Sequence, residues 1–548
     1  MYAWLRERLA AFSTRPARPA LDEGDAMLIT YGDQFLANGE LPLHTLARFA
    51  GRYLQDGIRS IHILPFYPST SDDGFAVADY CQVDPALGGW EQVRALGDRY
   101  DLMFDAVINH VSAGSAWFLA FRQGDAAYRD YFIDLPPDTP LAQVVRPRTT
   151  PLLTPFDTPR GRRWVWTTFS ADQVDLNYAN PRVLHEMIDV LLFYVRQGAR
   201  FIRLDAIAYL WKEAGTSCIH LPQTHAVVQL FRAILDEAAP GVLLITETNV
   251  PHRDNLSYFG DGANEAHLVY NFALPPLVLH TFATGEAAAL SRWADGLRLP
   301  SGQVTFFNFL ASHDGVGLNP VRGILSGEQI DALVQRCLDH GGLVSSKTNA
   351  DGSTSPYELN ISYFDALSDP AGDEPPALQV QRFLAAQAIL LALVGLPGIY
   401  VHSLLGSRSW QAGLHLTGRS RTINREKLDF SRLVAELEDP RSLRAQVYRG
   451  YLRLLRARAG CPAFHPHGSQ QVLDVHPGVF ALQRTAPDGQ SRALCLHNVT
   501  DQEQEFPLAH CIPPGTDWLD LLRDRPADLS RGIVRLEPYQ VYWLRQAS

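Results

Sequence analysis

The chain has 548 residues, of which 46% are hydrophobic, and this hydrophobic content excludes an intrinsically disordered protein. Lys and Arg number 48 against 59 Asp and Glu, so the net charge is −11. A nucleic-acid partner would need a basic surface, so we expect small molecules as partners instead. The longest apolar run, residues 389–401, contains Gly395, Pro397 and Gly398 and is too short to span a bilayer, so no membrane association is expected.

The N-terminus and the cysteines both favour a cytoplasmic protein. The first residues, MYAWLRERLAAF, alternate charged with apolar side chains and lack the continuous apolar centre of a signal peptide. The six cysteines form no CxxC pair, which is typical of reduced thiols rather than of a disulfide framework; they stand at positions 81, 218, 337, 461, 495 and 511.

Short apolar runs alternate with amphipathic runs along most of the chain. Helices are predicted at 43–55, 90–100, 181–196, 224–237 and 377–394. Alternation of strands and helices predicts an α/β fold with a parallel sheet, and eight strands favour a closed (β/α)8 TIM barrel. The strands are predicted at 26–31, 60–66, 102–108, 201–205, 242–247, 267–272, 304–310 and 398–402.

Two long segments and a change of pattern divide the chain. Residues 111–180 follow the third strand as an inserted subdomain, and residues 315–376 follow the seventh as a lid. The barrel then comprises residues 1–110, 181–314 and 377–464, ending with a helix at 441–459. Alternating runs at 479–484, 492–498 and 534–545 predict a small all-β domain at 465–548.

Acidic residues stand at the ends of several predicted strands. Arg203 and Asp205 end one strand, Glu247 ends the next, and His313-Asp314 follows the seventh. Because the carboxyl ends of barrel strands meet at one mouth, we expect these acids to share a small volume and to raise one another's pKa values. Arg203, two positions before Asp205, lies on the same face of the strand and is expected to keep Asp205 ionised.

Two carboxylates on either side of a sugar carry out retaining glycosyl transfer. One attacks the anomeric carbon, while the other protonates the leaving oxygen and later deprotonates the incoming acceptor. A third carboxylate can hold the ring hydroxyls more tightly as the ring flattens in the transition state.

Each residue taken alone has a plainer interpretation. A single carboxylate at a strand end is usually a cap or a loop acceptor, and His110 alone is more often a buried structural histidine. Asn109 could ligate calcium, but no acidic calcium loop lies nearby, so no metal is expected. The convergence of several carboxylates, an arginine and two histidines on one rim favours a catalytic site.

Four segments resemble the signature regions of the α-amylase family of glycoside-active enzymes and occur in the same order: DAVINH, GARFIRLDAIAY, LLITETN and FLASHDG. The resemblance implies that Asp205 is the nucleophile, Glu247 the general acid/base and Asp314 the transition-state stabiliser. It also implies supporting roles for Arg203, His110 and His313.

Other segments resemble the sucrose phosphorylase subfamily, whose enzymes use orthophosphate as the second acceptor: RLDAIAYLWKEAGTSC, YNFALPPLVLHTF, RPR at 146–148 and TINR at 422–425. The resemblance implies that Arg148 and Tyr357 handle phosphate, and the planar fork of arginine suits an anion in an acidic pocket. It further implies contacts to glucose from Asp72, Phe75, Gln173, Tyr209 and Arg425.

The chain departs from sucrose phosphorylases around the acceptor position. The stretches ETNVPH, with Thr248, Asn249 and His252, and GRSRTINREKL resemble the glucosylglycerate phosphorylase branch. Thr422 stands where sucrose phosphorylases have an Asp, and the nearby cations Arg419, Arg421 and Lys427 make the rim more positive. This suits an acceptor with a carboxylate, such as glycerate, although the same cations could be ordinary surface residues.

We therefore expect a retaining phosphorylase that converts 2-O-α-D-glucosyl-D-glycerate and phosphate to α-D-glucose 1-phosphate and D-glycerate. Phosphate would be a co-substrate, no cofactor would be needed, and the enzyme would be a monomer or homodimer. The alternatives are a sucrose or glucosylglycerol phosphorylase, an α-glucosidase or transglucosidase, and an inactive carbohydrate-binding barrel.

Overall fold

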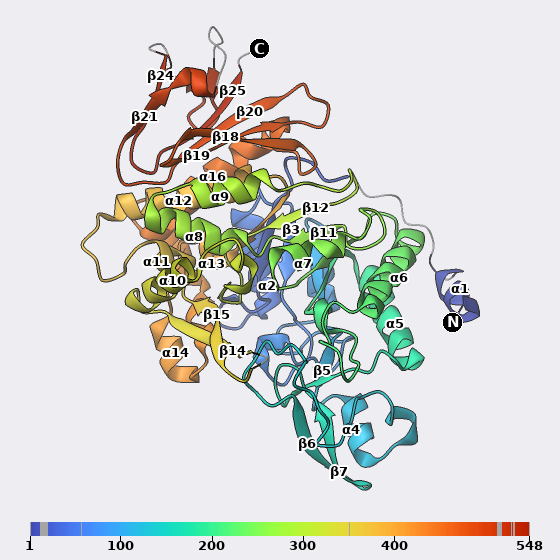
Figure 1. Cartoon of the computed structure of the whole chain (residues 1–548). Helices are drawn as coiled ribbons and strands as arrows, with labels where there is room; N and C mark the ends of the chain where they lie inside the picture. The colour runs from blue at the N-terminus through green and yellow to red at the C-terminus, as the bar shows by residue number, and fades with distance from the viewer. Residues whose placement is uncertain are drawn as a thin grey trace.

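The computed structural model describes residues 2–10, 12, 20–55, 57–349, 351–511, 518–527, 529 and 532–546. Its centre is a barrel of eight parallel strands, which confirms the predicted (β/α)8 fold (Figure 1). The strands are β1 (Met27–Thr30), β3 (Ser60–Ile63), β4 (Asp101–Ala106), β9 (Ala199–Leu204), β10 (Leu243–Thr246), β11 (Leu268–Tyr270), β12 (Thr305–Asn308) and β16 (Leu396–Tyr400).

The barrel closes because β1 pairs with a strand on each side. Met27 lies opposite Gly398 of β16 and opposite Ser60 of β3. All residues of β1, β3, β12 and β16 are buried, as expected for parallel strands covered by helices. A side chain at Gly398 would place its Cβ 2.3 Å from the ring of Phe307, so glycine is needed for the close packing inside the barrel.

Several strands are shorter than the sequence predicts. The runs 60–66, 102–108 and 304–310 each extend two or more residues beyond the strand that the structure contains. The extra residues, such as Phe66, Ile108 and Leu310, are also buried, so their apolar character continues after the backbone has left the sheet. The apolar runs therefore predict which residues are buried, but they do not predict where each strand ends.

Helices pack around the barrel at the predicted places. The helix α5 (Pro181–Gln197) begins after Asn180, whose side chain accepts a hydrogen bond from the Arg182 N–H, and ends at Gly198 in the left-handed conformation. The other predicted helices are α2 (Pro42–Tyr53), α3 (Trp90–Gly97), α6 (Pro222–Ala238), α12 (Pro376–Ala392) and α16 (Leu443–Ala459).

Two insertions lie on the side of the barrel away from the C-terminal sheet (Figure 1). The first contains β5 (His110–Ser112), α4 (Ala116–Gln123), the hairpin of β6 (Leu153–Thr158) with β7 (Gly161–Trp166), and β8 (Gln173–Asp175). The second contains α10 (Gly327–Asp339) and the hairpin of β14 (Leu343–Thr348) with β15 (Thr354–Asn360).

An antiparallel sheet follows the barrel. Its order is β18-β19-β20-β25-β22-β23. The predicted single run at 534–545 is wrong: it contains two strands that belong to different sheets, because a turn with Tyr539 at φ 54° separates them. The strands of the larger sheet are β18 (Ser469–His476), β19 (Val479–Thr485), β20 (Arg492–Asn498), β22 (Trp518–Asp520), β23 (Arg525–Pro526) and β25 (Val541–Gln546). A separate two-stranded sheet consists of β21 (Gln504–Pro507) and β24 (Ile533–Leu536).

Two buried arginines donate hydrogen bonds to backbone carbonyl oxygens where the barrel meets this sheet. Arg484 on β19 donates to the carbonyl oxygens of Ala392 and His465, both at 2.8 Å. Arg458 on α16 donates to the carbonyl oxygen of Asp25, just before β1, at 3.0 Å. Burial lowers the pKa of Arg458 to about 9. The sheet therefore packs at the amino ends of the barrel strands.

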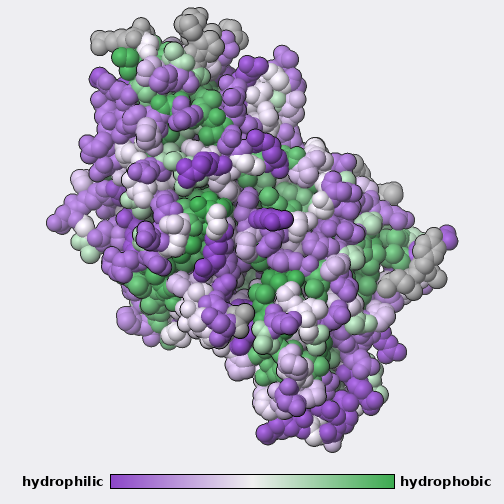
Figure 2. Space-filling model, in the orientation of Figure 1, coloured by the Kyte–Doolittle hydropathy of each residue, from purple (hydrophilic) through white to green (hydrophobic). Residues whose placement is uncertain are grey.

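The surface is mainly polar. Hydrophilic residues cover most of the face in Figure 2, and hydrophobic residues appear there as separate patches. No helix within the described residues has the length and apolar character needed to cross a membrane.

Candidate active site

A cavity of about 600 Å³, its open mouth included, lies at the carboxyl ends of the barrel strands. Most of the residues that the sequence predicts for a site line it: Asp72, Phe75, His110, Arg148, Gln173, Asp205, Tyr209, Glu247, Thr248, Asn249, His313, Asp314, Tyr357 and Arg421. The walls also include four residues that the sequence did not indicate, namely Phe169, Ala206, Ala208 and Glu358.

Asp205 directly follows β9 and is held by Arg203 on the same strand. Arg203 Nη1 lies 2.9 Å from Asp205 Oδ1 and also contacts the buried carboxylate of Asp105 on β4. Burial alone would raise the pKa of Asp105, but His62 and Arg203 lower it to about 2. Arg203 is thus buried beneath the cavity, between two carboxylates, where its charge is balanced.

Glu247 directly follows β10 and shares this arginine. Its Oε2 lies 4.0 Å from Arg203 Nη2 and accepts a hydrogen bond from the Ala206 N–H at 2.9 Å. The side chains of Glu247 and Asp205 are each only 11% exposed. Because both carboxyl groups lie within 4.0 Å of one guanidinium, they occupy the same small volume and neither faces bulk solvent.

Burial and the charge of Arg203 act in opposite directions on the pKa values of Asp205 and Glu247. Burial raises the pKa of Asp205 well above its ordinary value, against the effect of Arg203, and burial also raises the pKa of Glu247. Burial therefore favours the protonated form of a carboxyl group in this pair, whereas Arg203 favours the ionised form. Arg203 Nη1 lies 2.9 Å from Asp205, whereas Nη2 lies 4.0 Å from Glu247, so the guanidinium stabilises the ionised form of Asp205 more strongly than that of Glu247.

Asp314 completes the acidic wall and is surrounded by cations. Its Oδ1 lies 2.6 Å from Arg421 Nη1 and 3.7 Å from Arg425 Nη2. Burial would raise the pKa of Asp314, but the positive charge of Arg421, with His313 and Arg425, lowers it well below its ordinary value. These cations therefore favour the ionised form of Asp314.

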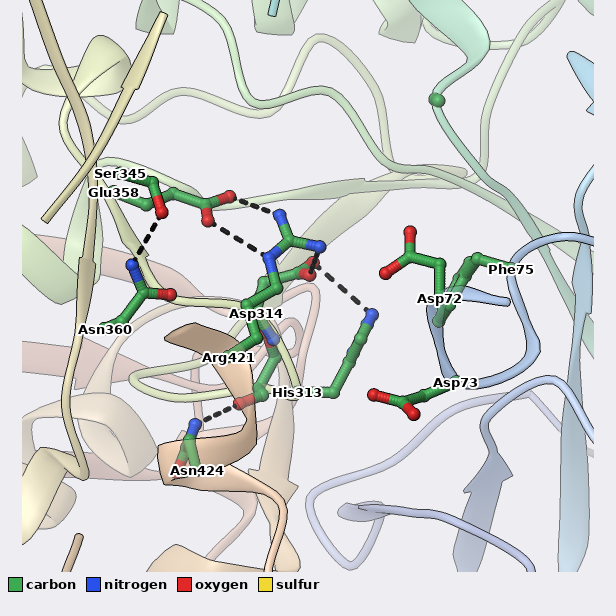
Figure 3. A network of polar contacts seen from close by, with 12 residues as sticks. Asp72, Asp73, Phe75, His313, Asp314, Ser345, Glu358, Asn360, Arg421 and Asn424 are labelled. Carbon is green, nitrogen blue, oxygen red and sulfur yellow. Dashed lines mark hydrogen bonds and ion pairs between the residues drawn. The ribbon is translucent and has the colours of Figure 1, made fainter. Parts of the chain in front are cut away.

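Arg421 is also held by Glu358, a residue that the sequence analysis missed (Figure 3). Glu358 Oε1 lies 2.6 Å from Arg421 Nη2, and its Oε2 accepts from Nε at 3.2 Å. The ladder between β14 and β15 shifts between Ser345 and Ser346, which leaves Tyr357 unpaired. This bulge lets both Tyr357 and Glu358 line the cavity, whereas strict alternation would turn one of them away.

The loop at Asp72 and Asp73 forms the opposite wall (Figure 3). Both residues have left-handed backbones, at φ 54° and 50°, and Gly74 has φ 109°. Gly74 is required, because a Cβ there would lie 2.5 Å from the Pro65 carbonyl oxygen. Asp72 lines the cavity, whereas Asp73 forms the ion pair with Arg425. Arg425 therefore supports the cavity wall from behind.

Aromatic and amide side chains fill the space between these carboxylates. Phe75 stacks on His313 with ring centroids 4.7 Å apart. Gln173 donates to Asp72 at 3.2 Å and to the Phe75 carbonyl oxygen at 3.2 Å. His110 contacts the same carbonyl oxygen at 2.8 Å. These contacts hold the side chains of Phe75, Gln173 and His110 in the wall of the cavity that Asp205 also lines.

Arg148 stands in the wall made by the two insertions. Its Cζ lies 5.8 Å from the ring centroid of Phe169 and 5.6 Å from that of Tyr357. Its hydrogen bond to a protein atom is a 3.3 Å contact with the Pro147 carbonyl oxygen. Among the described residues, no carboxylate lies within ion-pair distance of Arg148.

Two residues predicted near the acceptor lie elsewhere. His252 begins α7 (His252–Leu256) and packs edge-on against Trp293 with centroids 5.7 Å apart, outside the cavity walls. Arg419 is 59% exposed and lies 3.7 Å from Asp73. Thr248 and Asn249, by contrast, line the cavity directly after Glu247.

The described residues contain no group of three or more His, Cys, Asp or Glu side chains that could hold a metal ion. The six cysteines are all free thiols. The chemistry of the cavity is that of its carboxylates and guanidinium groups, which suit transfer of a glycosyl group through a buried Asp and Glu pair.

The parallel barrel with Asp205, Glu247 and Asp314 at its mouth defines an enzyme of the α-amylase family. The family model described as the catalytic domain of alpha amylase matches residues 52–306. A crystal structure of sucrose 6F-phosphate phosphorylase from Thermoanaerobacter thermosaccharolyticum superimposes with a TM-score of 0.76 at 24% identity, covering 88% of this chain and 96% of that one.

Curated relatives place the chain more closely. A glucosylglycerate phosphorylase of Spirochaeta thermophila is 53% identical over 96% of this chain and 91% of its own length. A glucosylglycerate phosphorylase of Escherichia coli is 45% identical over 96% of this chain and 92% of its own length. The chain belongs to the glucosylglycerate phosphorylase family, a group of glycoside phosphorylases within the α-amylase family.

Proposed function

We propose that the protein catalyses the reversible phosphorolysis of 2-O-α-D-glucosyl-D-glycerate to α-D-glucose 1-phosphate and D-glycerate, with retention of configuration. The observation that carries the proposal is the buried pair of Asp205 and Glu247 on one guanidinium, Arg203. Such a pair supplies an ionised nucleophile and a protonated acid in the same small volume.

In the first half-reaction Asp205 attacks C1 of the glucosyl unit. The bond from C1 to the glycerate oxygen breaks while Glu247 gives its proton to that oxygen, so D-glycerate leaves with its hydroxyl restored. The product on the enzyme is a β-glucosyl ester of Asp205. Asp314, ionised beside Arg421, holds the glucose hydroxyls as the ring flattens.

In the second half-reaction an oxygen of phosphate attacks C1 from the face that glycerate left. The ester bond to Asp205 breaks, and Glu247 takes the proton of the attacking phosphate. α-D-Glucose 1-phosphate leaves, and both carboxyl groups return to their starting states. Water must be kept from the ester in this interval, and the segments 111–180 and 315–376, which supply Arg148 and Tyr357 to the cavity, form its cover in the proposal.

The glucosyl unit is bound by the remaining walls. Asp72 and Gln173 offer oxygen and nitrogen atoms to its hydroxyls, and the stacked Phe75 and His313 pack against its ring. Arg425 contributes through Asp73, with which it pairs, and Tyr209 and His110 close the wall.

Phosphate is bound by Arg148 and Tyr357 in this proposal. Arg148 offers guanidinium donors without a competing carboxylate among the described residues, and a planar fork matches two phosphate oxygens. The proposal needs no cofactor. It places the enzyme in the cytoplasm, where its free thiols remain reduced, as a monomer or homodimer.

The test is to incubate the protein with glucosylglycerate, with sucrose and with glucosylglycerol, each with and without phosphate, and to measure glucose 1-phosphate and glucose. We expect glucose 1-phosphate from glucosylglycerate only when phosphate is present. Phosphate-independent release of glucose would indicate an α-glucosidase or transglucosidase, and faster phosphorolysis of sucrose would indicate a sucrose phosphorylase. No turnover of any glucoside would indicate a carbohydrate-binding barrel.

A further inference from the structure

We infer that Arg148 holds both anions of the reaction in turn: the carboxylate of D-glycerate in one half-reaction and phosphate in the other. The inference rests on the proposed function, because it needs an anionic leaving group and an anionic second acceptor. It differs from the expectation drawn from the sequence, in which Arg419 and Arg421 receive the glycerate carboxylate.

Arg421 is already neutralised on every side that its guanidinium presents. Nη1 contacts Asp314, and Nη2 and Nε contact the two oxygens of Glu358 (Figure 3). Glu358 is 3% exposed, so it is not diverted by solvent. A glycerate carboxylate at Arg421 would have to displace a buried carboxylate from a bidentate pair, which leaves that carboxylate without compensation.

Arg419 is no better placed. Its side chain is 59% exposed, it lies 3.7 Å from Asp73, and it is not part of the cavity wall. An exposed cation of this kind is screened by water and contributes little to binding.

Arg148 has the opposite surroundings. It lines the cavity, its Cζ lies 5.8 Å and 5.6 Å from the ring centroids of Phe169 and Tyr357, and it has no carboxylate partner among the described residues. The rings hold the guanidinium in place without satisfying its N–H groups. Arg148 is therefore prepared to receive an anion, and its forked donors fit the two oxygens of a carboxylate as well as those of a phosphate.

The charges in the cavity walls leave one arginine, Arg148, for both the glycerate carboxylate and phosphate. Its walls carry five carboxyl groups, Asp72, Asp205, Glu247, Asp314 and Glu358, and only two guanidinium groups, Arg148 and Arg421. Because Arg421 is committed to two of the five, an entering anion finds one uncommitted cation in this part of the structure. Glycerate must then leave before phosphate binds, so the two acceptors exclude each other.

The experiment uses α-D-glucosyl fluoride as donor, because it loads Asp205 by losing fluoride and brings no organic anion to the cavity. D-Glycerate, glycerol or phosphate is then supplied, and the ratio of transfer product to free glucose is measured. Glycerol is matched to glycerate except that a hydroxymethyl group replaces the carboxylate. The ratio reports how the glucosyl-enzyme divides between acceptor and water, whatever the rate of its formation.

We expect Arg148→Gln to lower the ratio about 10- to 100-fold for D-glycerate and for phosphate, and to change it by less than about threefold for glycerol, as loss of a charge-assisted bond predicts. The matched control is Arg146→Gln, because Arg146 is a half-buried arginine two positions away that donates to the Thr150 carbonyl oxygen and does not line the cavity. Its ratios should equal those of the wild type.

Loss of phosphate transfer alone in Arg148→Gln would overturn the inference and leave the proposed function intact. A selective loss of glycerate transfer in Arg419→Ala, without one in Arg148→Gln, would also overturn it. If the wild type transfers glucose to neither D-glycerate nor phosphate, the proposed function fails, and the inference fails with it.

Discussion

The substitution Arg203→Met tests whether this arginine keeps the nucleophile ionised. Arg203 is 2% exposed and contacts Asp105, Asp205 and Glu247. Methionine keeps most of the volume and removes the charge, so the carboxyl groups lose their shared cation. An opposite charge at such distances lowers an aspartate pKa by about 1–3 units, so its removal raises the pKa of Asp205 by about that amount.

The sign of the effect on activity follows directly. In the proposed mechanism attack requires ionised Asp205, so kcat/KM falls on the acidic side as this group takes up a proton. A higher pKa moves the acidic limb of the kcat/KM profile to higher pH, by about 1–3 units. Breaking the buried ion pairs also lowers the free energy of unfolding, by about 3–5 kcal/mol.

The assay measures initial rates of glucose 1-phosphate formation between pH 4 and 9, together with denaturant unfolding. The matched control is Arg200→Met, because Arg200 lies on the same strand, is 3% exposed and faces Asp101 at 3.9 Å instead of the cavity. The control should lose stability without a shift of the acidic limb. An acidic limb in Arg203→Met that coincides with that of Arg200→Met would refute the reasoning.

Three further predictions follow from the same structure. Glu247→Gln should lose activity on glucosylglycerate by about 10²–10⁴-fold but release fluoride from α-D-glucosyl fluoride, which needs no proton; equal losses would contradict its role as acid. The pKa of Asp105 is about 2, below its ordinary value, so its stabilisation is present above about pH 4 and is lost as the pH falls towards 2; the free energy of unfolding should therefore fall by about 2 kcal/mol less between pH 5 and pH 2 in Asp105→Asn than in the wild type. Gly74→Ala should raise KM and should destabilise the protein by more than its control, Gly161→Ala. Gly161 also has a positive φ, 93°, but a Cβ there would meet no atom within 4 Å, so the control should lower the free energy of unfolding by only about 1 kcal/mol. Similar unfolding curves for the two variants would show that the contact with Pro65 is relieved.

The sequence predicts the barrel and the acidic centre because both depend on local patterns. Apolar runs mark all eight strands, and Asp205 and Glu247 come directly after two of them, so the fold brings them together without further information. Arg203 is found by the two-residue period of a strand, and its contact with Asp205 is the one expected.

The rest of the site depends on contacts between distant segments. Glu358 reaches the cavity only because the ladder of its hairpin slips beside Tyr357, and no residue type announces such a bulge. The pairing of Arg425 with Asp73 is set by three consecutive left-handed residues. His252 follows Glu247 closely in sequence, yet α7 turns it towards Trp293.

The loop at residues 72–74 has a consequence for how this cavity can vary. Asp72 and Asp73 have the same functional group, and only their order along the chain decides which one lines the cavity and which one pairs with Arg425. If one residue were inserted or deleted before Gly74, a different residue would stand in the cavity wall and a different residue would face Arg425, although the number of aspartates would hardly change. The length of this short stretch is therefore constrained as tightly as the identity of its residues.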